Sequence, residues 1–316
     1  MSFLSEYGLF LLKLFTGLFG VIMAAAVLAG LMQKNKKSSA KLTIKKLNKQ
    51  FEHYQTLLLE GMEDKEALKS LKKSQKKAEK SHSTESPKLF VLNFRGDIKA
   101  SAVSSLSEEI TAILLIAKPR DSLLLRLESP GGMVHAYGLA AAQLARIKTA
   151  GLKLIICVDK VAASGGYLMA AVADHLIAAP FAFIGSIGVV LQLPNFHQYL
   201  KKKNIDFEQI TAGEYKRPLS LFGENTDKGR EKAQEEVNET LDLFKAHLEQ
   251  CRPQLMLDQV ATGEHWLGEK ALKLGLIDEI GTSDDYLLKA SSTHQIYVVE
   301  YLLAKTWTER WFANAN

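Results

Sequence analysis

The stretch DKVAASGGYLMAAVAD, residues 159–174, decides how this sequence is interpreted. An apolar run, Leu152 to Val158, precedes it and predicts a buried strand, and the Ala-rich run Tyr167 to Ala173 predicts a helix. Ser164 therefore stands at a strand-to-helix turn, beside the unpaired N–H groups and the partial positive charge of a helix start. That position suits a nucleophile, because a developing oxyanion is stabilised there. The simpler interpretation is that Ser164 only caps the helix.

A second glycine turn precedes this one in the chain. The sequence SPGG, residues 129–132, lies between the apolar run Leu123 to Leu127 and another predicted helix. Its glycine pair, like the pair Gly165–Gly166, leaves room for a substrate carbonyl and offers backbone N–H groups. Neither turn has the spacing of a dinucleotide-binding loop, and the Walker pattern is absent. The two turns together favour acyl transfer.

A serine nucleophile needs a general base, and the residues alone leave several open. None of the eight histidines lies in a recognisable triad signature; they include His135, His175, His197, His247 and His265. A lysine serves as a base when burial or a neighbouring cation lowers its pKa towards neutrality. Lys216, within TAGEYKRP (residues 211–218), is one candidate, because aromatic, cationic and proline neighbours flank it.

Several motifs in the same order resemble the signal peptide peptidase A family of membrane serine peptidases, in particular its short SohB-type branch. They are SPGG, DKVAASGGY, GSIGV (Gly185 to Val189), AGEYKR, GENT (Gly223 to Thr226) and VATGEHW (Val260 to Trp266). The resemblance covers roughly residues 86–290. It implies a Ser–Lys dyad with no metal and no cofactor.

The resemblance also implies a role for individual residues. Ser164 would be the nucleophile and Lys216 the general base, with Ser186 orienting the lysine amine. The N–H groups of Gly131 and Gly165 would bind the oxyanion. The second glycines of the two turns would line the substrate groove: Gly132 and Gly166. In single-domain members of the family the dyad is completed across a subunit boundary, so a homo-oligomer with a shared site is expected.

Strands and helices alternate from Lys88 onward, at about one unit per thirty residues, which predicts an α/β fold with largely parallel strands. The predicted strands are Lys88–Phe94, Leu123–Leu127 and Leu154–Val158, and the predicted helices are Val103–Ala117, Val134–Ile147, Asp227–Gln250 and Glu269–Leu274. The resemblance narrows the fold to a ClpP/crotonase-like spiral of ββα units. Thr226 is expected to cap the long helix that follows it, and His265 and Trp266 to be packing or turn residues.

The N-terminal residues predict a transmembrane anchor. Nineteen residues, Leu14 to Met32, carry no charge, and about 20 apolar residues span a bilayer. A cleaved signal peptide is the alternative, but Glu6 and the lack of a basic residue before Lys13 fit it poorly. The lysines after the span favour a cytoplasmic catalytic side, whereas some family members work on the periplasmic face. The expected location is the bacterial inner membrane, with a single pass.

Four segments are predicted: an anchor (1–33), a basic helical spacer and flexible linker (34–87), a catalytic domain (88–290) and a C-terminal tail (291–316). Residues 34–80 hold fourteen lysines and six acidic residues, whereas the whole chain has a net charge of only +5. The basic character is therefore local, which argues against nucleic-acid binding and fits contact with acidic lipid headgroups. The two cysteines suggest neither a disulfide nor a zinc site.

The sequence thus predicts a membrane-anchored serine endopeptidase that cleaves peptides, or unfolded or membrane-associated protein segments. Two alternatives stay open. A crotonase-type acyl-CoA enzyme would use the paired N–H groups and would not need the hydroxyl of Ser164. A catalytically inactive membrane scaffold would bind peptides in the same groove without cleaving them.

Overall fold

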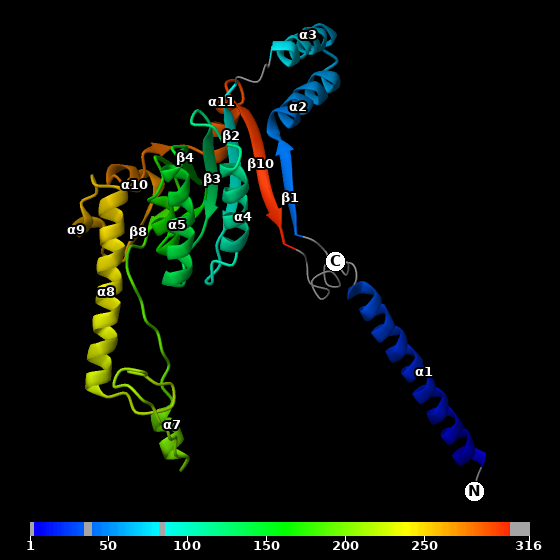
Figure 1. Cartoon of the computed structure of the whole chain (residues 1–316), viewed down its shortest axis with the longest axis vertical. Helices are drawn as coiled ribbons and strands as arrows, with labels where there is room; N and C mark the ends of the chain where they lie inside the picture. The colour runs from blue at the N-terminus through cyan, green and yellow to red at the C-terminus, as the bar shows by residue number, and fades with distance from the viewer. Residues whose placement is uncertain (1–2, 35–39, 82–85, 304–316) are drawn as a thin grey trace. The chain divides into compact units, whose positions relative to one another are not determined.

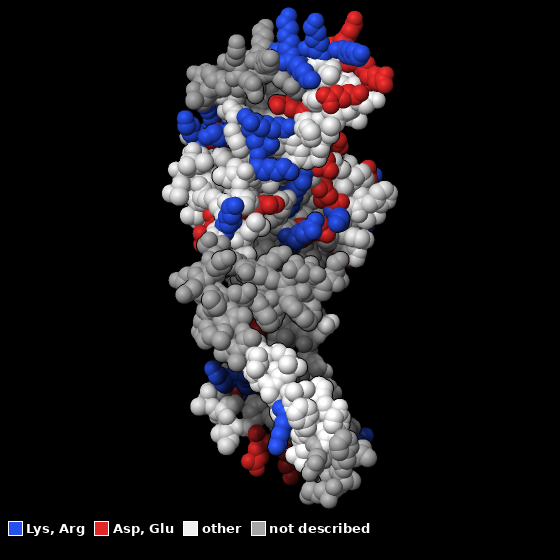
Figure 2. All heavy atoms as spheres, turned by 90° about the vertical axis from the view of Figure 1, so that its right-hand side faces the viewer, with Lys and Arg blue, Asp and Glu red and all other residues white. Residues whose placement is uncertain are grey.

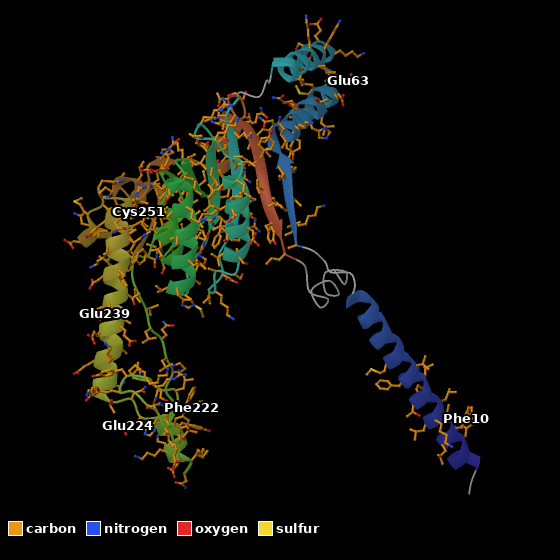
Figure 3. All side chains as sticks on the ribbon, viewed as in Figure 1. Phe10, Glu63, Phe222, Glu224, Glu239 and Cys251 are labelled. Carbon is orange, nitrogen blue, oxygen red and sulfur yellow. The ribbon has the colours of Figure 1, made fainter. Side chains whose placement is uncertain are left out.

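The computed structural model describes residues 3–34, 40–81 and 86–303, with side chains at 7–23, 40–73 and 86–303. The chain divides into two compact units, Met1–Lys41 with Leu302–Asn316, and Leu42–Tyr301. The smaller unit contains helix α1 (Phe3–Lys34), along which described side chains such as Phe10 are exposed (Figure 3). Among the described residues no helix combines the length and apolar character that crossing a membrane requires. The predicted transmembrane anchor is therefore not confirmed.

The larger unit is built on a sheet whose described strands follow the order β1-β10-β2-β3-β4-β6-β9 (Figure 1). Their bounds are β1 (Lys41–Lys46), β2 (Lys88–Arg95), β3 (Ser122–Glu128), β4 (Lys153–Val158), β6 (His175–Ala178), β9 (Glu279–Ile280) and β10 (Gln295–Leu302). All neighbouring pairs from β10 to β9 are parallel. The central strands are nearly continuous apolar runs, as expected for a parallel sheet covered on both faces. The predicted α/β class is confirmed.

Helices cover both faces of this sheet. The elements concerned are α4 (Val103–Leu114), α5 (Val134–Thr149), α6 (Gly165–Ala170) and α11 (Ser283–Ala290). The first three enclose the main core, in which side chains such as Leu125 of β3 and Ile156 of β4 are fully buried. On the other face Leu287 of α11 belongs to the same buried cluster as Leu124 and Ile155. Alternate residues of each strand therefore fill two separate cores.

A smaller sheet contains the strand that ends directly before Ser164. It consists of β5 (Val161–Ala163), β7 (Phe183–Gly185) and β8 (His265–Leu267). β5 and β7 are parallel, with Ala163 opposite Gly185. Trp266 of β8 is buried, and a Cβ on Gly185 would lie 2.9 Å from its ring. Trp266 is thus a packing residue, as the sequence predicted.

After β7 the chain forms a long segment, residues 186–226, in which the described helix is α7 (His197–Lys202) (Figure 1). Many of its apolar side chains are exposed: Val190, Leu191, Phe196, Tyr199, Ile205, Phe207, Ile210 and Phe222. The segment ends at α8 (Asp227–Cys251), where Thr226 Oγ1 accepts a hydrogen bond from the Gly229 N–H at 3.1 Å. The predicted cap at Thr226 is confirmed. Two short helices follow, α9 (Leu257–Val260) and α10 (Gly268–Lys273).

The residues that follow β1 in the larger unit differ from the sequence prediction. α2 (Leu47–Gly61) and α3 (Lys65–Ser81) are both helices. The flexible linker predicted at the end of the 34–87 segment is therefore helical as far as Ser81. In Figure 2, Lys and Arg side chains gather with acidic ones at the top, where α2 and α3 lie. Alanine, leucine, lysine and glutamate favour helices strongly, which explains why this polar stretch is helical.

The C-terminal residues also differ. Residues 291–316 were expected to be a tail, but β10 lies inside the sheet between β1 and β2. Its sequence QIYVVEYL is rich in β-branched and aromatic residues, and Ile296 and Val299 are buried. The compact unit therefore extends beyond the predicted 88–290 domain at both ends.

Candidate active site

Ser164 lies between β5 and α6, as the sequence predicted. Its backbone has φ 50° and ψ −119°, a region that a residue with a side chain rarely adopts and that costs about 1–3 kcal/mol. Its N–H donates to the Gly185 carbonyl at 2.8 Å, and its carbonyl accepts from the Leu168 N–H at 3.0 Å. The Ser164 side chain makes no capping hydrogen bond. The interpretation of Ser164 as a simple helix cap is therefore wrong.

Ser186 has a similar positive φ at the end of the neighbouring strand. Its φ is 52°, and its N–H donates to the Glu264 carbonyl at 2.6 Å. Because Ala163 pairs with Gly185, the two serines follow directly after paired residues of parallel strands. The structure thus brings Ser164 and Ser186 together at neighbouring strand ends, both in strained backbone conformations.

The SPGG turn lies against Ser164. Gly131 has φ 93°, and a Cβ added to it would lie 2.8 Å from the Ser164 Cβ. However, the Gly131 N–H donates to Ser129 Oγ at 3.1 Å, so this predicted oxyanion donor is already engaged. Gly132 and Gly165 line the pocket beside Ser164.

Gly166, the other glycine predicted to line the groove, is buried. A Cβ added to it would lie 2.5 Å from the Ser129 carbonyl oxygen. Gly166 therefore permits the two turns to approach each other, and the groove assignment for this residue is corrected.

An apolar pocket of about 490 Å³ opens beside Ser164. One face of α5 contributes small residues at helical spacing: Gly138, Ala141, Ala142 and Ala145. The facing residues of α8 are Thr240, Leu243, Phe244 and His247. Pockets of this kind, mostly apolar with few polar groups, are typical of ligand sites.

His247 is a histidine that the sequence left open as a base, and it lines this pocket. Its Nε2 lies 3.1 Å from the Leu168 carbonyl oxygen. A carbonyl only accepts, so Nε2 carries the proton and is engaged by the helix that follows Ser164. Burial lowers the pKa of His247, which favours the neutral ring.

Lys216 lies elsewhere in the same chain. It is exposed, and the ring of the preceding Tyr215 lies 5.8 and 5.6 Å from the amines of Lys228 and Lys232, near the start of α8. The pocket contacts α8 only from Thr240 onward, about 12 Å further along the helix axis. Figure 3 shows Phe222 and Glu224 beside the start of α8 and Cys251 at its other end. One chain does not bring Lys216 into the Ser164 pocket.

Two residues next to this site were not assigned a role from the sequence. Ser129, the first residue of the SPGG turn, and Tyr137 are both fully buried, and their side-chain oxygens lie 2.6 Å apart. In the sequence, Tyr137 stands three and four residues before Ala140 and Ala141, on the apolar face of a predicted helix. This pattern is the same for any core residue, so it does not reveal the hydroxyl's role. Within the described residues, no cluster of three or more His, Cys, Asp or Glu has the arrangement of a metal site.

Two models of one protein family match this chain. The model described as Peptidase family S49 N-terminal matches residues 2–144, and the model described as Peptidase family S49 matches residues 146–296. The chain belongs to peptidase family S49. Membership of S49 makes it a peptidase, and it confirms the resemblance that the motifs indicated.

Individual S49 relatives agree over almost the whole chain. It is 46% identical to the Probable protease SohB of Haemophilus influenzae, over 99% of this chain and 93% of that protein. It is 53% identical to the Probable protease SohB of Buchnera aphidicola subsp. Acyrthosiphon pisum, over 72% of this chain and 68% of that protein. The chain is thus a SohB-type member of S49.

Two solved structures are also similar to this S49 chain. One is a mutant of the 1510-N membrane-bound stomatin-specific protease, with a TM-score of 0.38 and 18% identity, covering 65% of this chain and 84% of that one. The other is a mutant of ClpP1 from Listeria monocytogenes, with a TM-score of 0.40 and 15% identity, covering 64% of this chain and 94% of that one.

Proposed function

We propose that this S49 peptidase is a serine endopeptidase in which Ser164 is the nucleophile and Lys216 of a neighbouring copy is the general base. The observation that carries the proposal is the geometry of Ser164. Its backbone is strained, its side chain does not cap the helix, and it borders the apolar pocket with two glycine turns. Strain of this kind persists where the surrounding structure holds it and function uses it.

In the proposed reaction Ser164 Oγ attacks the scissile carbonyl while the neutral amine of Lys216 takes its proton. The oxyanion accepts hydrogen bonds from the N–H groups of Gly165 and Gly132. Gly132 replaces the expected Gly131 here, because the Gly131 N–H already donates to Ser129. Each such donor contributes about 2.7–4 kcal/mol. Lys216 then protonates the leaving amine, and it activates the water that hydrolyses the acyl-enzyme.

A shared site accounts for the position of Lys216. A lysine becomes an effective base when its amine is removed from water, and Lys216 is exposed in the single chain. The segment that carries it also exposes many apolar side chains, which is typical of a surface that another protein covers. In a homo-oligomer this segment would deliver Lys216 to the neighbouring Ser164, where the hydroxyl of Ser186 would orient the amine. This arrangement belongs to the ClpP/crotonase-like architecture that we also propose.

The proposed substrates are extended peptides and unfolded or membrane-associated protein segments, with one side chain in the apolar pocket. We further propose that α1 is a single-pass anchor in the bacterial inner membrane, supported by its nineteen uncharged residues. The basic residues that follow would contact acidic lipid headgroups. A tether of this kind raises the effective concentration of membrane-associated substrates. Alkaline extraction of membranes tests the anchor: retention in the pellet supports it, and release contradicts it.

The proposed function is tested by casein cleavage with the detergent-solubilised protein and its Ser164→Ala variant. Ser104→Ala, an exposed serine on α4, is the matched control. We expect Ser164→Ala to lower kcat by on the order of 10⁴-fold or more, and the control to leave it unchanged. Equal cleavage by the Ser164→Ala variant would contradict the proposal. An acyl-CoA enzyme or a scaffold would leave casein uncut in all three proteins.

A further inference from the structure

A buried chain of hydrogen bonds lies behind the SPGG turn. The Gly131 N–H lies 3.1 Å from Ser129 Oγ, which lies 2.6 Å from Tyr137 Oη. Tyr137 Oη in turn lies 2.8 Å from the carbonyl oxygen of Asp97. Ser129 and Tyr137 are both 0% exposed. Polar groups buried in this way are stabilising only when all of them are paired.

Donors and acceptors fix the direction of this chain. The Asp97 carbonyl can only accept, so Tyr137 gives it its one hydroxyl proton. Ser129 must then donate to Tyr137 Oη, and its oxygen accepts from the Gly131 N–H. Burial raises the pKa of Tyr137, so the phenol keeps its proton at neutral pH. The hydroxyls of Ser129 and Tyr137 therefore each donate one hydrogen bond and accept one.

The same two side chains also touch the turn after the nucleophile. A Cβ added to Gly165 would lie 2.5 Å from the Tyr137 ring, and a Cβ added to Gly166 would lie 3.1 Å from the Ser129 Cβ. The Ser129 backbone pairs with the strand before Ser164, since its N–H donates to Val161 and its carbonyl accepts from Ala163. Ser129 and Tyr137 thus contact both glycine turns at once.

We propose that Ser129 and Tyr137 are positioning residues that hold the two glycine turns at the separation needed for oxyanion binding. The hydrogen bond from the Gly131 N–H to Ser129 Oγ directs this N–H towards the core and away from the pocket. Gly132, the next residue, lines the pocket together with Gly165. This inference rests on the proposed function, because it concerns the oxyanion of the same reaction.

The test compares Tyr137→Phe with Tyr167→Phe. Both tyrosines are 0% exposed, and each hydroxyl donates to a backbone carbonyl at 2.8 Å. The Tyr167 hydroxyl, however, donates to the Leu276 carbonyl and takes no part in the hydroxyl chain of Ser129 and Tyr137. Phenylalanine keeps the ring that packs against Gly165. Ser129→Ala removes the other hydroxyl, and serves if Tyr137→Phe does not fold.

We expect Tyr137→Phe to lower kcat by about 10-fold, less than the loss of an oxyanion donor itself, with KM changed by less than about 2-fold. Binding of a peptide aldehyde ending in leucine should weaken by a similar factor. In its tetrahedral adduct Ser164 Oγ bonds to the aldehyde carbon, the π bond of the C=O group opens to give an oxyanion, and the Oγ proton passes to the Lys216 amine. Tyr167→Phe should leave both quantities unchanged. Ser129→Ala combined with Tyr137→Phe should be no worse than either alone, because both interrupt one chain.

Two results would overturn the positioning role. One is equal kcat and aldehyde binding for the Tyr137→Phe and Tyr167→Phe variants. The other is a double variant, Ser129→Ala with Tyr137→Phe, whose loss of kcat equals the product of the losses in the two single variants. The proposed function is judged separately, by loss of casein cleavage in Ser164→Ala. Failure of the positioning role therefore leaves the nucleophile assignment standing.

Discussion

The turn that carries Ser164 and the segment that carries Lys216 differ in almost every physical respect. Around Ser164 two strand ends, two glycine turns and a buried hydroxyl chain hold the backbone in place. Around Lys216 the chain makes few regular hydrogen bonds, and its apolar side chains face solvent, with Ile210 96% exposed. The fold therefore builds one half of the proposed site inside the chain and leaves the other half on its surface.

This difference indicates how the two halves are stabilised. The nucleophile turn depends on packing within one chain, because its strain must be held by neighbours. Apolar packing within the lysine segment includes the rings of Phe196 and Phe207 against Phe222, but many of its apolar side chains stay exposed. Contact with another copy would bury them. Substitutions around Ser164 should therefore affect the site within each chain. Substitutions in the lysine segment should affect activity by weakening the association of chains.

Of the substitutions considered, Ile210→Asp in the lysine segment should cause the largest loss of oligomer and of casein cleavage. A charge in a covered apolar surface is costly, so the oligomer should dissociate and casein cleavage should fall by at least about 10-fold. The Leu115→Asp variant is the control, because Leu115 is 81% exposed at the end of α4, outside this segment. Light scattering and cleavage rates measure both effects. Equal oligomer size and activity in the two variants would contradict the claim that the lysine segment is covered by a neighbouring copy.

Ala142→Leu should have a smaller effect, on the pocket beside Ser164. Ala142 is exposed in α5 and lines the pocket, so a larger side chain there fills space without disturbing the core. For peptides with a large apolar residue before the cut, kcat/KM should fall about 10-fold, which corresponds to about 1.4 kcal/mol. Peptides with alanine at that position should be cleaved as before. Equal loss for both peptides would contradict the role of the pocket.

Glu109→Gln should change stability and leave cleavage unaffected. Burial raises the pKa of Glu109 to about 7, while its carboxyl accepts from the Tyr301 N–H at 2.7 Å. The folded chain therefore favours the protonated acid, and ionisation destabilises it as pH rises from about 4.5 past 7. At pH 8 glutamine should stabilise the fold by up to about 3 kcal/mol. At pH 4.5 the gain should vanish; thermal unfolding at both pH values checks this, and an equal gain would contradict it.

The sequence could predict the parts that follow from local pattern. The apolar runs of β2, β3 and β4, the Thr226 cap and the position of Ser164 at a strand-to-helix turn all have direct signatures. The strand β10 was missed because a strand far along the chain joins the sheet only through long-range pairing. The engagement of the Gly131 N–H by Ser129 was also invisible, since it depends on Tyr137, eight residues further on, reaching back behind the turn.

The most direct test of the shared site is co-expression of Ser164→Ala and Lys216→Ala chains carrying different affinity tags. Each variant alone should be inactive. In mixed oligomers purified through both tags, a site is complete where an intact serine meets an intact lysine from the neighbouring chain. Equal mixing in a ring then predicts about a quarter of the wild-type activity. Mixed oligomers of normal size that stay inactive would contradict the account.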